Sequence, residues 1–252
     1  MNAPLKKPVS SNLPIISEPI QRVQSGMHHD PFEVLGPHVQ SDGSTLIRAF
    51  LPAAERFHLA SRIDRWVLRH AIDWMQAVPD LTSIENLSVN LSGQSVGDRA
   101  FHRWANEVLT GAGADIRARL CFEITETAAV TNLTDAAAFI EQVRAAGVRV
   151  ALDDFGAGAS SFGYLKTLAV DFLKIDGQFI RDLVTDPLDD AAVRCFADVA
   201  KVVGIKTVAE FVEQEEVLER LRAIGVDFAQ GFLLHRPVPI DELLAVAVQT
   251  AG

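Results

Sequence analysis

The chain has 252 residues, of which 48% are hydrophobic and 22% are charged, and its formal net charge is −10 at pH 7. This acidic balance argues against a protein that binds long nucleic acids, because that binding is normally driven by a basic surface. The length suits either two small domains or one α/β barrel, and the apolar fraction is sufficient for a single large core.

The first twelve residues predict no folded element. The stretch MNAPLKKPVSSN holds two lysines with no apolar segment behind them, so it is neither a signal peptide nor a membrane span. We expect residues 1–12 to be a flexible leader or a linker remnant, and residues 13–252 to form one domain. Two lone cysteines, Cys121 and Cys195, lie in apolar contexts that favour core thiols and a reducing cytoplasm.

From residue 13 onward, short β-type runs alternate with helix-type periodicity. The eight predicted strands are Leu13–Ile20, Phe32–Leu35, Leu87–Asn90, Leu120–Ile124, Val148–Asp153, Phe172–Ile175, Thr207–Glu210 and Phe228–Gln230. Most are near-continuous apolar runs, as expected for strands that are covered on both faces. Between them, Arg62–Met75 and Gln214–Ile224 carry the apolar stripe of core-facing helices.

This alternation implies a parallel sheet, and eight strands in this length predict a single (β/α)8 TIM-type barrel of the α/β class. A doubly wound open sheet is the alternative. No glycine-rich phosphate-binding loop follows any of the predicted strands, so the sequence favours the barrel.

Polar side chains recur at or just past the C-terminal ends of the predicted strands. They are Glu33, Asn90, Glu123, Asp153, Asp154, Lys174, Glu210 and Gln230. The catalytic groups of barrel enzymes lie at that rim. Any one of these residues alone is more readily explained as a cap or an ion-pair partner, but capping does not explain polar groups at seven strand ends.

A ring of carboxylates that faces one cavity needs cations or protons, because like charges at short range repel. Oxygen ligands of this kind suit Mg²⁺, Mn²⁺ or Ca²⁺. Two such ions can polarise a phosphoryl oxygen and generate a hydroxide nucleophile, and they let an anionic phosphodiester enter an acidic site. Lys174 can then orient the water or neutralise charge that develops on the phosphate. The pattern predicts a mouth that holds divalent metal against a phosphodiester.

Ten segments of the chain carry a family resemblance. In order they are SEPIQ, FEVL, FLPAAERF, IDRWVLRHA, LSVNLS, FEITET, LDDFGAGASSF, FLKID, TVAEFVE and AQGFLLHRPV, between Leu13 and Pro239. With these segments the chain resembles the EAL-domain family, the bacterial cyclic di-GMP phosphodiesterases. The resemblance implies a cytoplasmic signalling hydrolase that converts cyclic di-GMP to linear pGpG with two Mg²⁺ or Mn²⁺ ions, and that Ca²⁺ inhibits. A homodimer and an upstream regulatory domain or partner protein stay open.

The same resemblance implies a role for each site residue. The implied metal ligands are Glu33, Asn90, Glu123, Asp153 and, for the second metal, Asp154. Lys174 stands beside the nucleophilic water, Glu210 is a further catalytic residue and Gln230 lies on the substrate side. Glu126 matches a glutamate that steadies the loop after the LDDFG strand.

Several positions depart from the family pattern. Gly36-Pro37 stands where the family has an apolar residue and an arginine that holds substrate phosphate, and proline removes a strand donor there. Ala157 and Ala159 replace the usual threonine and tyrosine of the loop after DDFG, and Phe211 replaces a glycine. These changes define the alternative interpretation, a degenerate, non-hydrolysing EAL domain that acts as a cyclic di-GMP receptor or a protein-interaction module.

A second, shorter resemblance covers His28 to His38. The stretch HHDPFEVLGPH is similar to a segment near the start of glycogen branching enzymes, but nothing downstream resembles the catalytic domain of that family. We interpret the adjacent His28 and His29 as a solvated turn and not as a metal-binding pair.

Overall fold

The computed structural model describes residues 36–39, 45–48, 59–82, 84–158 and 162–237. They fall into two units, residues 1–63 and residues 64–252, and each unit is described here by itself. The predicted leader, the predicted strands Leu13–Ile20 and Phe32–Leu35, and with them Glu33, lie outside the described residues.

The described strands of the first unit form an antiparallel pair. Strand β1 is Gly36–Val39 and strand β2 is Thr45–Arg48, and Pro37 stands opposite Ile47 in their register. We did not predict this pair, because the resemblance placed Gly36-Pro37 just past a strand of the barrel. The sequence between the two strands contains Asp42-Gly43, a dipeptide typical of hairpin turns, so a usable signal was present.

The second unit contains a parallel sheet with the strand order β3-β4-β5-β6-β7-β8. Its strands are β3 Leu87–Leu91, β4 Leu120–Thr125, β5 Arg149–Phe155, β6 Phe172–Ile175, β7 Lys206–Ala209 and β8 Phe228–Ala229. Each strand pairs with the next one along the chain, as expected for consecutive βα units. The last six predicted strands are therefore confirmed, with small shifts at their ends. Among the described residues the sheet has six strands and is not closed.

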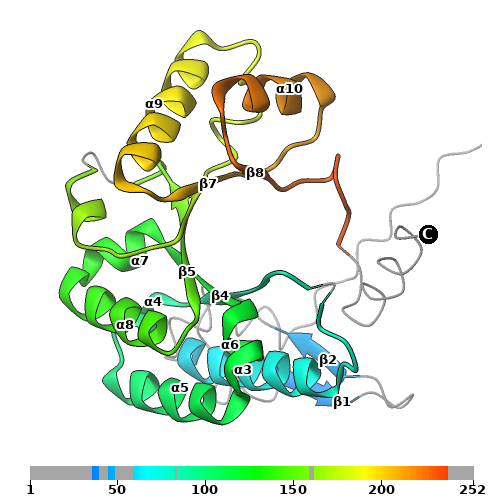
Figure 1. Cartoon of the computed structure of the whole chain (residues 1–252), viewed down its shortest axis with the longest axis vertical. Coiled ribbons are helices and arrows are strands. Elements are labelled where there is room, and N and C mark those ends of the chain that lie inside the picture. The colour runs from blue at the N-terminus through cyan, green and yellow to red at the C-terminus, as the bar shows by residue number, and fades with distance from the viewer. Residues whose placement is uncertain (1–35, 40–44, 49–58, 83, 159–161, 238–252) are drawn as a thin grey trace, which may run out of the picture. The chain divides into compact units, whose positions relative to one another are not determined.

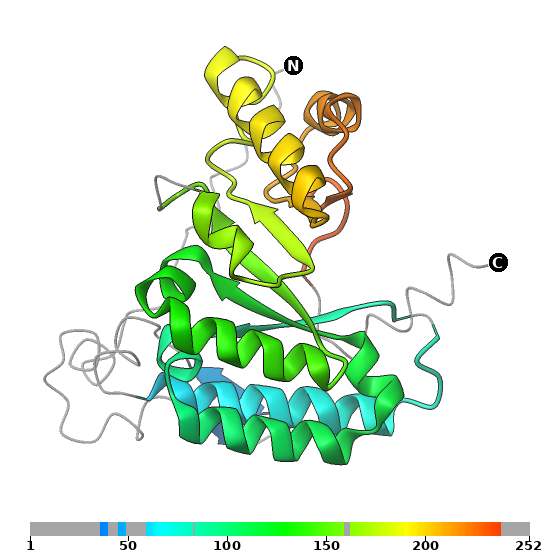
Figure 2. The same cartoon turned by 60° about the vertical axis from the view of Figure 1, so that its left-hand side comes forward.

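Helices cover the outer side of this sheet. They are α3 Ala60–Ala77, α4 Gly93–Val96, α5 Arg99–Ala112, α6 Ala114–Arg119, α7 Glu126–Thr131, α8 Leu133–Ala145, α9 Pro187–Val203 and α10 Glu215–Ile224, with a 3₁₀ helix η2 at Phe162–Lys166. Figure 1 shows the strands as an arc with α8, α9 and α10 outside it, and α5 packs beside α8 in Figures 1 and 2. Both predicted helices are confirmed.

The core lies between the strands and these helices. The ring of Phe139 on α8 stacks on Phe122 of β4 at 6.2 Å and meets the edge of Phe101 on α5 at 6.0 Å. Truncation of such a ring to alanine typically costs about 3–5 kcal/mol of folding stability.

Cys121 is buried, and burial raises the pKa of its thiol to about 12, so it is an inert core residue. The prediction that both cysteines are core thiols is therefore confirmed for Cys121 and wrong for Cys195, which is exposed on α9.

Aspartates just before two strands fix the register of the sheet. Asp171 precedes β6 and its Oδ2 accepts a hydrogen bond from the backbone N of Val150 at 2.9 Å. Asp227 precedes β8 and its Oδ2 accepts from the backbone N of Thr207, also at 2.9 Å. These bonds hold neighbouring strands side by side at their start. The C-terminal ends of the strands therefore meet at one edge, where the predicted site residues lie.

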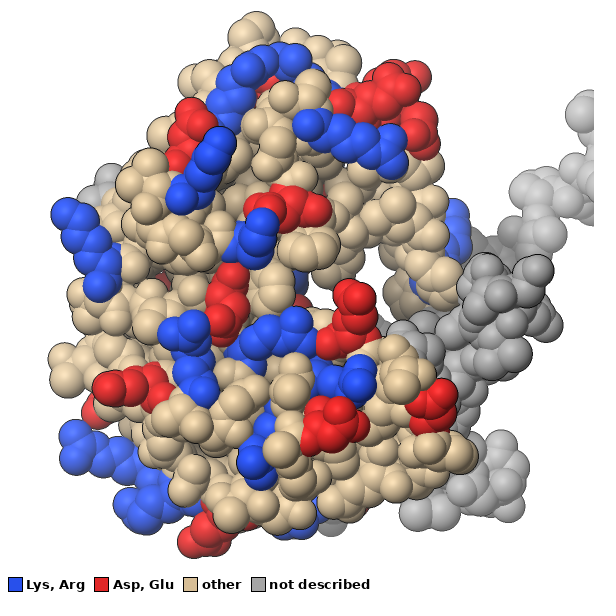
Figure 3. All heavy atoms as spheres, in the orientation of Figure 1, with Lys and Arg blue, Asp and Glu red and all other residues tan. Residues whose placement is uncertain are grey.

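The described surface carries both signs of charge. On the face drawn in Figure 3, Lys and Arg side chains are interspersed with Asp and Glu. Within the described ranges, no helix has both the length and the apolar character that crossing a membrane demands.

Candidate metal centre

A bulge at the end of β5 brings two consecutive aspartates to the same place. The register runs from Leu152 opposite Leu173 to Phe155 opposite Ile175, so β5 has one residue more than β6 over this step. In a regular strand successive side chains point to opposite faces, and a bulge breaks that alternation. Asp154 has a left-handed backbone with φ 55°, and its backbone N donates to Oδ1 of Asp153 at 3.1 Å.

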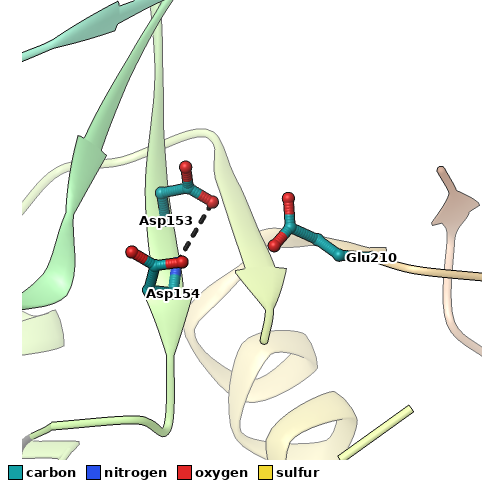
Figure 4. Close-up of side chains that lie close together, drawn as sticks. All are labelled: Asp153, Asp154 and Glu210. Carbon is teal, nitrogen blue, oxygen red and sulfur yellow. Dashed lines mark hydrogen bonds between the residues drawn. The ribbon is translucent and has the colours of Figure 1, made fainter. Parts of the chain in front are cut away.

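The result is a cluster of carboxylates at the rim of the sheet. Asp153 and Asp154 come from β5, and Glu210 follows β7. One carboxylate oxygen of each lies within 4.8 Å of the others, and Figure 4 shows the three groups converging. The strands thus bring together three of the side chains that the sequence predicted at one carboxylate-rich rim.

Lys174 lies in the middle of the carboxylates. Its Nζ is 2.7 Å from Glu123 Oε2, 2.9 Å from Asp153 Oδ1 and 2.8 Å from Glu210 Oε1. An ammonium group has three hydrogens to donate, and three carboxylates lie within reach of them. Lys174 is 4% exposed, so these ion pairs are shielded from water. Burial alone would lower the pKa of Lys174, but the carboxylates outweigh it and hold the pKa above its usual range.

The carboxylates outnumber this single ammonium. Glu123, Asp153, Asp154 and Glu210 supply four acidic groups around one lysine. Burial raises the pKa of Glu210 above its ordinary value, although hydrogen bonds from Lys174 oppose the rise. Burial, and next the charge of Asp153, raises the pKa of Asp154. Both carboxyl groups therefore hold protons more tightly than they would in water, as expected where negative charge is in excess.

A divalent cation fits this donor set. The charged groups that could ligate a metal ion here are carboxylates, whose oxygens Mg²⁺ and Mn²⁺ prefer as ligands. A divalent cation would also neutralise their excess negative charge. Asn90 of β3 stands opposite Glu123 in the register of β3 and β4, so its side chain leaves the sheet on the same face as that of Glu123. Within the part of the chain that the structure describes, the carboxylate oxygens of Asp153, Asp154 and Glu210 lie close enough together to share one ion.

Glu126 holds the loop after β5. It begins α7 and is 1% exposed, and its Oε2 accepts a hydrogen bond from the backbone N of Gly156 at 3.0 Å. Its Oε1 accepts a hydrogen bond from the hydroxyl of Tyr164. Gly156 stands two residues after Asp154, so Glu126 holds the backbone that leaves the carboxylate cluster.

Gln230 lies at the end of β8 and has an exposed side chain. Its backbone N donates to the carbonyl of Ala209 at 2.8 Å, which joins it to the end of β7. It lines a cavity of about 440 Å³ together with side chains from β3 to β8, among them Glu123 and Lys174. The predicted substrate-side residue and the predicted water-orienting lysine therefore face one cavity.

The departures from the family pattern have different structural outcomes. Phe211 has a left-handed backbone with φ 54° and is 48% exposed, directly after Glu210. Its ring packs where a Cβ on Gly177 would lie, 2.2 Å away, and the guanidinium of Arg181 sits 4.7 Å from the ring centre. Ala157 is exposed in the loop after β5, and Ala159 lies outside the described residues.

Sequence reasoning missed three residues that support the site. Asp176, whose charge also raises the pKa of Asp154, ends the FLKID segment, and the strand-end rule could have found it. Tyr164 and Asp64 have partners far away in the sequence. The Oδ2 of Asp64 accepts from the backbone N of Ser92 at 2.9 Å and from the hydroxyl of Ser95 at 2.6 Å, so it holds the turn that follows β3.

Comparison with known proteins places this geometry in a family. The model of the EAL domain matches residues 18–237. The cyclic di-GMP phosphodiesterase PdeB of Shewanella oneidensis is 40% identical over 225 residues, which are 88% of this chain and 26% of that protein. PdeF of Escherichia coli, also a cyclic di-GMP phosphodiesterase, is 34% identical over 91% of this chain and 30% of its own length. The chain therefore spans about a third or less of these two relatives.

Solved structures agree with the sequence relatives. The PaMucR phosphodiesterase in complex with c-di-GMP superposes with a TM-score of 0.71 at 32% identity, over 82% of this chain and 84% of that one. The FimX EAL domain from Pseudomonas aeruginosa, bound to c-di-GMP, gives a TM-score of 0.69 at 28% identity, over 80% and 81%. These likenesses confirm the predicted fold class, and with the family model matched along residues 18–237 they show that the chain belongs to the EAL domain family.

Proposed function

We propose that this domain is a metal-dependent phosphodiesterase that hydrolyses cyclic di-GMP to linear pGpG. The observation that carries the proposal is the buried Lys174 among Glu123, Asp153 and Glu210, with Asp154 beside them. Relatives that carry this activity in their names, and a phosphodiesterase solved with c-di-GMP, support the choice of ligand. Turnover measured with Mg²⁺ or Mn²⁺ tests it.

We assign metal binding and stabilisation of the developing charge to different residues of the site. Glu123, Asp153, Asp154, Asn90 and, from sequence alone, Glu33 would hold the metal. When bound, Mg²⁺ or Mn²⁺ polarises a phosphoryl oxygen and lowers the pKa of water. Lys174 can place its positive charge against the negative charge that develops on the phosphate oxygens, where a preorganised donor is most effective.

The reaction adds one water molecule across one phosphodiester of the ring. The water oxygen forms a bond to phosphorus, the bond from phosphorus to the 3′ oxygen breaks, and the 3′ oxygen takes a proton. We assign this proton transfer to Glu210, a buried carboxyl group at the same rim whose Oε1 lies 2.8 Å from Nζ of Lys174. The product keeps its phosphate on the 5′ side, as linear pGpG requires.

Divalent metal should raise the melting temperature, and the gain should grow with pH. In the metal-free protein, Asp154 and Glu210 have pKa values above their ordinary 3.8 and 4.5, so the folded state binds more protons than the unfolded state in the window above those values. The free energy of unfolding of the metal-free protein therefore falls as pH rises through that window. A cation replaces the protons, and at a concentration a hundred times its Kd it stabilises by about 2.7 kcal/mol.

The measurement is a thermal melt in EDTA and in millimolar Mg²⁺ or Mn²⁺, at acidic and at neutral pH. We expect the difference between the two curves to widen from the acidic to the neutral buffer. Identical melting temperatures with EDTA and with metal at neutral pH would remove the metal centre from the proposal.

A second candidate function is a receptor that binds cyclic di-GMP without turnover. It is favoured by the antiparallel pairing of β1 with β2, since Gly36-Pro37 lies in that pair where the resemblance implied a phosphate-binding arginine. A receptor keeps affinity for the ligand and releases no product, so binding and turnover separate the two candidates. The cytoplasm, a homodimer and a regulatory domain or partner protein stay predictions about the setting of either one.

A further inference from the structure

Gly156 is held from two sides as the chain leaves the carboxylate cluster. Its φ is 95°, and a Cβ there would lie 2.7 Å from Phe179 and 2.9 Å from Phe196, so only glycine fits. The rings of Phe179 and Phe196 pack edge to face at 5.2 Å and form a rigid wall on that side. On the polar side its backbone N donates to Glu126 Oε2 at 3.0 Å.

The hydroxyl of Tyr164 fixes the carboxylate that makes this bond. Tyr164 lies in η2 and is 8% exposed, and its hydroxyl donates to Glu126 Oε1 while Oε2 serves Gly156. With one of these donors on each oxygen, the carboxylate has a defined orientation. Without the hydroxyl, Oε1 would lose a charge-assisted hydrogen bond in a buried place, which favours rotation of the group.

The bulge at Asp154 depends on such support. A non-glycine residue with φ 55° is held in a sparsely populated conformation, and such residues persist only where their surroundings over-determine them. Phe155, which follows Asp154, is fully buried and pairs with Ile175 of β6, and Gly156 comes next and is anchored from both sides. We propose that Tyr164 is a positioning residue for the candidate metal centre, which acts through Glu126 and Gly156 on the orientation of Asp154. The expected effect on turnover rests on the proposed function, whereas the link from Tyr164 to Gly156 rests on the hydrogen bonds of Glu126 alone.

Tyr164→Phe removes one hydroxyl and keeps the ring. We expect kcat for cyclic di-GMP to fall about ten- to a hundredfold and the half-saturating Mn²⁺ concentration to rise by a similar factor, the range found when groups that orient metal ligands are lost. KM for cyclic di-GMP should change little, since Tyr164 is buried and does not line the cavity that Gln230 and Lys174 share. The matched control is Thr131→Val, which removes a hydroxyl that donates to the carbonyl of Thr127 within α7 and should leave both quantities unchanged.

A local readout does not depend on activity. The amide proton of Gly156 should exchange with solvent faster in Tyr164→Phe than in the wild type and the control, as followed by NMR. Glu126→Gln should give the same effect, and the double variant should be no worse than Glu126→Gln alone, because both residues act through one bond. Unchanged exchange at Gly156 together with unchanged Mn²⁺ dependence in Tyr164→Phe would overturn the proposal.

The ionisation of Tyr164 can be followed by its absorbance, because it is the single tyrosine of the chain. Burial, and next the hydrogen bond to Glu126, raises the pKa of its hydroxyl above the ordinary 10.0. In Glu126→Gln the absorbance of tyrosinate should appear at lower pH than in the wild type, and a titration that is unchanged over the pH range in which both proteins stay folded would break the link. If the wild type shows no turnover, the proposed function fails, while the Gly156 exchange and the titration still decide the role of Tyr164.

Discussion

Replacement of Lys174 by methionine is expected to reduce hydrolysis of cyclic di-GMP by at least about a hundredfold, the scale on which loss of one preorganised donor acts. It should also lower the free energy of unfolding in EDTA by roughly 3 kcal/mol or more, because loss of one partner leaves buried charges uncompensated. Glu123, Asp153 and Glu210 would each lose a contact of 2.9 Å or less. Denaturant unfolding and a turnover assay measure the two effects.

The matched control is Lys201→Met, at an exposed position in the last turn of α9, which should change neither quantity. Added Mn²⁺ should recover part of the stability of Lys174→Met, because a cation can replace the lost ammonium among the carboxylates. Full turnover in Lys174→Met would remove the lysine from the reaction. Unchanged stability in EDTA would show that the carboxylates do not depend on it.

Asp153→Asn should abolish hydrolysis and keep the fold. The amide oxygen of asparagine can still accept from Lys174, but the lost charge weakens the hold on a divalent cation, and we expect turnover to fall by at least about a hundredfold. The metal-free protein should be as stable as the wild type or more so, since one of four crowded carboxylates is neutralised. Melting curves in EDTA and in Mn²⁺, with a turnover assay, measure both.

Asp198→Asn makes the same chemical change at an exposed position of α9 and serves as the control. Two outcomes would contradict the role of Asp153. Wild-type turnover in Asp153→Asn would take it out of the metal centre, and an unfolded variant would make its role structural.

Much of the fold of the second unit, and several of its candidate site residues, could be predicted from the sequence. The strands from Leu87 onward are apolar runs that end in a polar residue, and consecutive parallel strands bring those ends to one edge. Glu123, Lys174 and Glu210 could therefore be predicted as neighbours without a structure. The excess of carboxylates over lysines at that edge was also visible, and with it the need for a cation.

Features that depend on local register or distant packing could not be predicted. The bulge that turns Asp153 and Asp154 to one cluster is a shift in strand pairing, which leaves no periodic trace in the sequence. Tyr164 and Glu126 are 38 residues apart, and only the packed fold brings a hydroxyl to that carboxylate. Glu33 lies outside the described residues, so its place among the metal ligands stays a prediction.

The most direct test of the central claim is product formation. The domain is incubated with cyclic di-GMP in Mg²⁺ or Mn²⁺, in Ca²⁺ and in EDTA, the products are separated by chromatography, and binding is titrated in parallel in Ca²⁺. We predict linear pGpG with Mg²⁺ or Mn²⁺, none in EDTA, little in Ca²⁺, and a loss of product in Asp153→Asn. Saturable binding with no pGpG under any of these conditions would contradict the phosphodiesterase and identify the domain as a receptor.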